Sequence, residues 1–311
     1  MVHAERRAQQ AGLVAGDPGW RTARMTKIYD LSDPANPVFI RDFGLPGQQP
    51  DASGPVPVML HGPISTGPKG NRVYFGYGTN TDGILQIVDR EKLLNGPKEV
   101  TRDNLNYPQV SRLEFPTNIG AHTVLPLLDM EIEHFKKSQN SKRDFIVAVN
   151  ESINDECREA NQQVWIIDIT QEQRPFGVAN WTVKEPSGKF CDRGERFGAH
   201  SPQENMTPIF HKKILFVTWF SAGLRALDIR NPYEPKEIAY YIPAITADTK
   251  ADPTCLRRRS AATCKISIQT NNVEVDDRGY IYIVDRANTG MHILELTGPA
   301  RKIANMKAAI Q

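Results

Sequence analysis

Three histidines stand at matching places in short motifs that recur along the chain, and their side chains are the ones best suited to chemistry. The motifs are LHGP around His61, AHTV around His122 and AHSP around His200. Imidazole nitrogens are ligands that Zn, Cu and Fe ions favour, and a metal with three protein ligands keeps a position open for water or substrate. If the motifs occupy equivalent places in repeated units, the sequence predicts a site for a divalent transition metal.

A fourth unit carries Asn271 and Asn272 at the equivalent place and so offers no fourth histidine. Glu274 follows them and can serve as an oxygen ligand, while Glu204 falls on the same strand face as His200 and can orient its imidazole. The predicted metal ligands are therefore His61, His122, His200 and Glu274.

A structural role is the alternative for these histidines. Each would then hydrogen-bond backbone groups, because buried polar groups need partners with or without a metal. His134 and His211 lie in insertions or turns and His292 alternates on a strand, so we expect these three to be structural or solvated. No catalytic residue can be assigned, and no dinucleotide or phosphate-binding loop is found, so no organic cofactor is expected.

A repeat supplies the elements that must position the three histidines. An apolar-rich strand that ends in an acidic residue recurs five times, at intervals of 59, 79, 60 and 67 residues. Periods near or above 50 residues, each with several β-rich runs, indicate the four-stranded blades of a β-propeller. Equivalent positions on the innermost strands would line a central channel, where the imidazoles would converge. The five strands end at Asp30, Asp89, Asp168, Asp228 and Glu295.

Two copies of the repeat carry a more specific pattern. The strand over residues 27–31 continues into SDPANPV at residues 32–38, and the strand over residues 224–229 continues into RNP. These residues resemble the LVIVD-repeat β-propeller family, whose blades carry a strand of the Val-Ile-Asp-Val type followed by Ser-Asp-Pro-x-Asn-Pro-Val. The resemblance implies a propeller fold and often an extracytoplasmic setting, but little about a reaction.

The predicted architecture is one β-propeller domain over residues 1–311, with residues 1–24 as a helical or irregular lead-in and a helix at residues 3–12. A half blade spans 25–43, and the last blade is expected to form its outer strand from residues 302–306. Because the half blade lacks two strands, we expect an incomplete ring whose upstream portion is missing. Full blades are expected to begin near Pro57, Asn118, Phe197 and Ser267.

The net charge and the cysteines limit the expected binding partners and the expected cellular location. A formal net charge of +2 gives no support for nucleic acid as a partner, and no apolar run is long enough to cross a bilayer. The four cysteines suggest two disulfides, Cys157 with Cys191 and Cys255 with Cys264, which favours a periplasmic or secreted full-length protein. This chain carries no signal peptide, and four free thiols in a cytoplasmic protein are the alternative.

The expected function is that of a binding protein that holds an unknown small ligand or protein at the mouth of a histidine-lined channel. One alternative is a channel-metal enzyme, an oxidoreductase or hydrolase similar in layout to four-histidine propellers such as the carotenoid oxygenases and the selenium-binding protein family. A plain protein-interaction scaffold is the other alternative, because fold alone does not give function.

Overall fold

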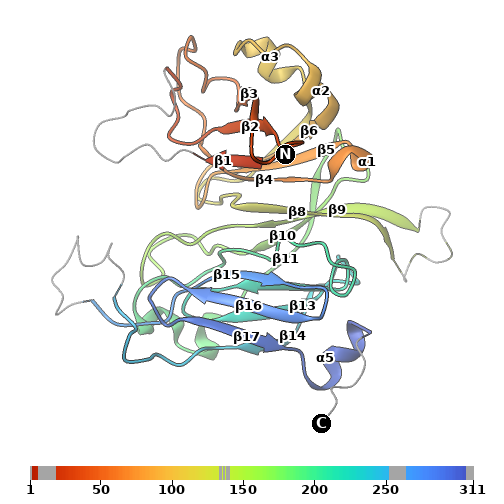
Figure 1. The fold of residues 1–311 in the computed structure, drawn as a ribbon. Helices are drawn as coiled ribbons and strands as arrows, with labels where there is room; N and C mark the ends of the chain where they lie inside the picture. Colours follow the sequence, from red (N-terminus) through yellow and green to blue (C-terminus); the bar gives the residue numbers. More distant parts are fainter. Residues whose placement is uncertain are drawn as a thin grey trace.

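Antiparallel strands make up the body of the molecule. A computed structural model describes residues 2–5, 19–132, 135, 137, 141–251 and 264–305. Within these residues the strands form five antiparallel sheets, each built from consecutive segments of the chain (Figure 1). The all-β prediction is confirmed, and every sheet contains one strand of the five-copy repeat.

The first sheet has the order β1-β2-β3, with β1 (Val2–Glu5), β2 (Thr26–Asp30) and β3 (Val38–Phe43). The sequence predicted a helix at residues 3–12 and no strand ahead of β2, and both expectations are wrong for residues 3–5. The segment pairs antiparallel with β2. An open strand edge offers unpaired N–H and C=O groups, and pairing with them outweighs the weak helical preference of so short a segment. Residues 6–12 lie outside the described part of the chain.

The second and third sheets have four strands each, as predicted for complete units. Short helices and turns lie only in the connections between or after their strands. The strands of the second sheet are β4 (Leu60–Ser65), β5 (Arg72–Tyr77), β6 (Ile84–Asp89) and β7 (Gln109–Glu114). The helices in its connections are α1 (Gly67–Gly70), α2 (Arg90–Asn95) and α3 (Arg102–Asn106). The third sheet contains β8 (Thr123–Glu131), β9 (Lys142–Val149), β10 (Val164–Asp168) and β11 (Phe176–Trp181), followed by η2 (Glu185–Ser187) and η3 (Phe190–Arg193).

The fourth and fifth sheets have three strands each. In the fourth sheet, the strand expected ahead of β12, in the unit that carries His200, is present only as a bridge between Pro202 and Val217. The strand predicted at residues 302–306 is wrong for residues 302 and 303, which belong to α5 (Gly298–Ile303). Pro299 in the first turn and the buried Ala300 favour a helix there. The strands of these sheets are β12 (Ile214–Thr218), β13 (Leu224–Asp228), β14 (Lys236–Tyr241), β15 (Thr270–Val275), β16 (Tyr280–Asp285) and β17 (Met291–Glu295).

A β-bulge stands next to the repeated Asp in four of the five sheets. Where the repeat strand pairs with the strand that follows it, the register shifts immediately before the Asp, and a bulge of this kind bends the strand and increases its twist. The shared irregularity shows that the copies are alike in backbone geometry as well as in sequence. The shifts fall at residues 28/29, 87/88, 166/167 and 226/227.

The repeated Asp itself makes a turn. The carboxylates of Asp30, Asp168 and Asp228 each accept a hydrogen bond from the amide two residues ahead, at 2.9, 2.9 and 3.1 Å. Such a bond closes an Asx turn and redirects the chain toward the next strand. Asp89 instead accepts from the amide of Lys92 at 3.0 Å and caps α2. The acidic residue of the repeat therefore has a structural role.

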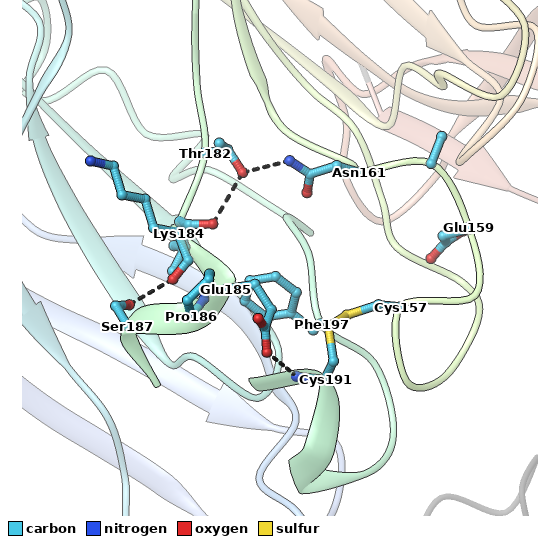
Figure 2. Close-up of a pocket in the computed structure, with 12 residues that line it drawn as sticks. Cys157, Glu159, Asn161, Thr182, Lys184, Glu185, Pro186, Ser187, Cys191 and Phe197 are labelled. Carbon is cyan, nitrogen blue, oxygen red and sulfur yellow. Dashed lines mark hydrogen bonds between the residues drawn. A yellow bond between two sulfur atoms is a disulfide. The ribbon is translucent and has the colours of Figure 1, made fainter. Parts of the chain in front are cut away.

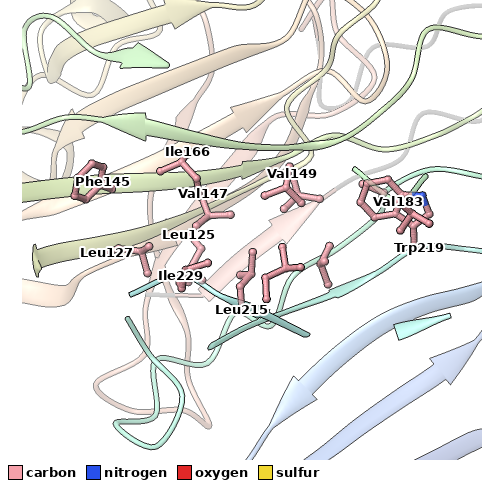
Figure 3. Close-up of a cluster of buried hydrophobic side chains, with 14 of the residues drawn as sticks. Leu125, Leu127, Phe145, Val147, Val149, Ile166, Val183, Leu215, Trp219 and Ile229 are labelled. Atoms are coloured by element: carbon pink, nitrogen blue, oxygen red, sulfur yellow. The ribbon is translucent and has the colours of Figure 1, made fainter. Parts of the chain in front are cut away.

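Apolar side chains fill the space between consecutive sheets. Figure 3 shows the cluster between the third and fourth sheets, which includes Leu125, Val147, Leu215 and Trp219. Corresponding clusters join the other neighbouring pairs, so each sheet packs on the next in chain order. The first and last sheets lie at opposite ends of the molecule in Figure 1. Among the described residues, no helix is long and apolar enough to span a membrane.

Candidate metal centre

The three predicted histidines lie at corresponding points of three sheets. His61 occupies a bulge at the start of β4, next to the residue paired with Tyr77. The amide of His122 donates to the carbonyl of Val149 at 2.9 Å, and the amide of His200 donates to that of Thr218 at 3.0 Å. Tyr77, Val149 and Thr218 are the last residues of β5, β9 and β12. Each histidine therefore lies next to the last residue of a neighbouring strand in its sheet, which is β5 for His61, β9 for His122 and β12 for His200.

Packing of consecutive sheets brings these three points together. The ring centroids of His61 and His122 are 3.4 Å apart with an interplanar angle of 31°, and those of His122 and His200 are 4.5 Å apart at 56°. His122 and His200 are buried, while His61 is partly exposed. The three rings are adjacent, as the sequence pattern predicted. That they share one metal ion stays a prediction, because the group of possible ligand atoms within 4.8 Å among the described residues includes His61 and His122 but not His200.

A fourth member of the cluster, Glu151, was missed by the sequence analysis. It lies two residues beyond the end of β9 and is buried, with 6% of its surface exposed. Its Oε2 is 3.9 Å from Nε2 of His122, and its Oε1 is 3.6 Å from Nε2 of His200. Candidate ligand atoms of His61, His122 and Glu151 all lie within 4.8 Å of one another. The one available signal was an acidic residue two positions after a fully apolar strand end.

Two arginines face the same carboxylate. Nη1 of the buried Arg196 is 3.2 Å from Oε1 of Glu151 and also donates to the carbonyl of Ser152 at 3.3 Å. Nη1 of Arg286 is 4.0 Å from the same oxygen. Both guanidinium groups lie over the ring of Phe220, at 5.5 and 6.0 Å from its centroid. Oε1 of Glu151 therefore faces His200 and both arginines, whereas its Oε2 faces His122.

Burial keeps the imidazoles of His122 and His200 neutral by lowering their pKa. It lowers the pKa of His200 to about 3, although the hydrogen bond to the carbonyl of Asn271 opposes the shift. Burial, and next the positive charge that His61 and His200 would carry, lower the pKa of His122 well below its ordinary value. Neutral imidazole is the form that binds metals. Burial also raises the pKa of Glu151, while Arg196 and Arg286 oppose that shift.

The hydrogen bonds of the rings decide which nitrogens are available. Nδ1 of His200 is 2.5 Å from the carbonyl oxygen of Asn271, which can only accept, so Nδ1 carries the proton and Nε2 keeps its lone pair. That arrangement, with the second nitrogen bonded to a backbone carbonyl, is typical of metal-ligating histidine. Nδ1 of His122 pairs with Oγ1 of Thr123 at 2.7 Å, and its buried Nε2 has no hydrogen-bond partner.

The predicted ligand Glu274 belongs to a different contact. Its side chain is exposed, and its carboxylate accepts hydrogen bonds from the amides of Glu204 and Asn205 at 2.9 and 3.3 Å. Glu204 is exposed as well, so the carboxylate that faces the imidazole of His200 is Glu151. Glu151, two residues after the end of β9, is therefore the carboxylate beside the histidines, where the sequence analysis expected Glu274.

The remaining histidines lie in other surroundings. The pKa of His211 is lowered to about 4 by burial, with a smaller effect from Lys212, and Nδ1 of His292 is 3.4 Å from the hydroxyl of Tyr241. His134 lies outside the described residues.

A disulfide ties together the two segments that carry the charged groups of the cluster. Cys157 is bonded to Cys191, as predicted, with a sequence separation of 34 residues. Cys264 is also disulfide-bonded, and Cys255, its predicted partner, lies outside the described residues. The Cys157–Cys191 bond and the ring of Phe197 line a pocket of about 510 Å³ beside the cluster's supporting loops (Figure 2). The bond thereby fixes the segment after β9 to the segment that leads to His200.

Comparison with known proteins identifies no family. No family model and no curated protein matches the chain. Among solved structures, the chain is similar to one described as AfRom2 CNH domain, with a TM-score of 0.38 and 7% sequence identity over 88% of this chain and 66% of that chain. The chain thus spans just under two thirds of that structure. At this level of similarity, the site has to be interpreted from its own residues.

Proposed function

We propose that the chain is a β-propeller binding protein of the LVIVD-repeat kind, in which the five sheets are blades and His61, His122 and Glu151 hold a divalent transition metal. The repeated strand, its bulge and its Asx turn support the propeller and the resemblance to that family. The Cys157–Cys191 bond supports an extracytoplasmic setting, since disulfides persist in oxidising compartments.

One observation carries the metal proposal. Nε2 of His122 is buried without a hydrogen-bond partner, and Glu151 and His61 offer ligand atoms within 4.8 Å. Two atoms bonded to one ion at about 2.1 Å can be at most about 4.2 Å apart, so small side-chain rotations close the set. A lone pair on His200 also faces Glu151 at 3.6 Å, which favours a cation between nitrogen and carboxylate.

The donor set also favours an enzyme as the second candidate function. Two imidazoles and one carboxylate are typical of catalytic zinc and of non-haem Fe(II), both of which keep positions open for water or substrate. Such an ion lowers the pKa of its bound water and supports hydrolytic or oxidative chemistry. His200 stands beside these ligands as a neutral imidazole, and because its pKa is lowered to about 3 its role there would be to accept a hydrogen bond from that water and not to remove its proton.

Calorimetric titration of the chelator-treated protein with Zn²⁺ tests the proposal. We expect one ion per chain, and we expect His122→Ala and Glu151→Gln to weaken binding about 100-fold or more, because each removes one of three ligands. The matched control is His292→Ala, which removes a half-buried imidazole on β17 and should bind as the wild type does. Wild-type protein without a stoichiometric site, or variants with unchanged affinity, would exclude the metal and leave a metal-free binding scaffold.

A further inference from the structure

Beyond the metal ligands, the cluster contains groups suited to an anion. We infer that the centre binds a small molecule bearing a carboxylate or phosphate group, which Arg196 and Arg286 hold over the ring of Phe220. The inference deepens the proposed function by naming the chemical class of the ligand, and its charge argument rests on the metal proposed above.

Arg196 is the residue on which the inference depends. Its side chain is buried, with 7% of the residue exposed, and its Nη1 is engaged by Glu151 and by the carbonyl of Ser152. Its buried Nε has no hydrogen-bond partner. A buried guanidinium N–H without an acceptor is costly, and a carboxylate or phosphate oxygen is the acceptor that its planar fork fits best.

Two more buried polar atoms without partners belong to segments that backbone hydrogen bonds join, one after the other, to Arg196. The hydroxyls of Ser221 and Thr270 are both buried without hydrogen-bond partners. The amide of Ser221 donates to the carbonyl of Arg196 at 3.3 Å, and the amide of Thr270 donates to that of Phe220 at 3.1 Å. Native structures leave few buried polar atoms unpaired, so their concentration beside Arg196 indicates a missing polar ligand.

An aromatic wall accompanies these donors. The ring of Phe220 has Arg196 at 5.5 Å, Arg286 at 6.0 Å and the imidazole of His200 at 5.0 Å from its centroid. Arg286 has 37% of its side chain exposed, so it reaches from the cluster toward solvent.

Charge favours the same class of ligand. A bound dication and Arg196 together outweigh the single negative charge of Glu151, even before Arg286 is counted. An excess of positive charge at a buried site is unfavourable unless an anion compensates it. A carboxylate or phosphate beside the metal supplies that compensation, whereas a neutral or cationic ligand does not.

Calorimetry with two probes, benzoate and inorganic phosphate, tests the inference on the full chain in its metal-free and Zn²⁺-loaded forms. We expect at least one probe to bind the loaded form with one molecule per chain, and the better probe identifies the oxyanion. Arg286→Gln should weaken binding at least tenfold. Arg286→Lys keeps the charge without the planar fork and should lose less, and it replaces Arg286→Gln if that variant fails to fold.

The control is Arg278→Gln, which removes an exposed guanidinium paired with Asp276 on the β15–β16 turn and should bind both probes as the wild type does. Zinc-loaded protein that binds neither probe overturns the inference while the metal proposal stands. Equal affinity in the wild type and in both Arg286 variants also overturns it. If the protein takes up no Zn²⁺ but still binds a probe, the result supports the inference and excludes the metal proposal.

Discussion

Removing Arg196 and Glu151 together should destabilise the fold by less than the sum of the two single removals, because each single removal leaves a buried charge without its partner. Their residues are 7% and 6% exposed, and the two charged atoms are 3.2 Å apart. Arg196→Met leaves the buried Glu151 carboxylate without its 3.2 Å partner, with Arg286 farther away at 4.0 Å. Removing one member of a buried ion pair costs about 3–5 kcal/mol, because the other charge stays desolvated.

The double-mutant cycle measures this coupling directly. Arg196→Met, Glu151→Gln and the double variant are unfolded with urea in the presence of a chelator, and the emission of the core residues Trp181 and Trp219 reports unfolding. We expect the double variant to be more stable than the sum of the single losses predicts, by more than about 1 kcal/mol. The wild type and each variant are compared at the same pH.

The surface pair Arg230 and Asp228 provides the matched control. Its Nη2 and Oδ2 are 2.7 Å apart, but the Arg230 side chain is 55% exposed. Such pairs contribute about 0–1 kcal/mol, so Arg230→Met and Asp228→Asn should show a smaller coupling. Additive losses for Arg196 and Glu151, within about 0.5 kcal/mol, would refute the account of the cluster as one electrostatic unit.

Three further outcomes follow from the described contacts. The pKa of His200 is about 3 in the fold against 6.5 for a free side chain, so between these values the unfolded state binds a proton that the folded state does not. The free energy of unfolding should therefore fall by about 1.4 kcal/mol for each pH unit below pH 6.5. The profile of His200→Gln should be flatter. Removing the disulfide by Cys157→Ala with Cys191→Ala should lower the free energy of unfolding by about 4 kcal/mol in urea, since the bond closes a 34-residue separation, and an unchanged midpoint would contradict this. Gly223→Ala places a Cβ 2.2 Å from a backbone carbonyl at φ +74°, and its melting temperature should fall well below that of Gly62→Ala, which meets no atom within 4 Å.

The sequence predicted the strands well because each apolar run is short and bounded by turn residues. The five repeat strands end in the structure at the acidic residues expected from the sequence, which are Asp30, Asp89, Asp168, Asp228 and Glu295. Matching positions in the repeat also sufficed to bring His61, His122 and His200 together, since similar units packed in series place equivalent residues at neighbouring sheet ends.

The residues that the sequence analysis missed depend on contacts between distant segments. Glu151 follows a strand end like any loop carboxylate, and its buried partners come from distant segments, among them Arg196, 45 residues later. The strand at Val2–Glu5 exists through its pairing with β2, which no local preference reveals. The expected ligand Glu274 has a suitable residue type, but it lies in β15 of the fifth sheet and its carboxylate accepts hydrogen bonds from the backbone amides of residues 204 and 205.

Anomalous diffraction from crystals grown with Zn²⁺ tests the metal proposal most directly. We expect a single strong peak at the zinc edge, with nitrogen atoms of His61 and His122 and an oxygen of Glu151 about 2.0–2.2 Å away. The same crystals of His122→Ala should lose that peak. A wild-type map with no peak among these three side chains, or with its strongest peak elsewhere on the protein, would contradict the proposal.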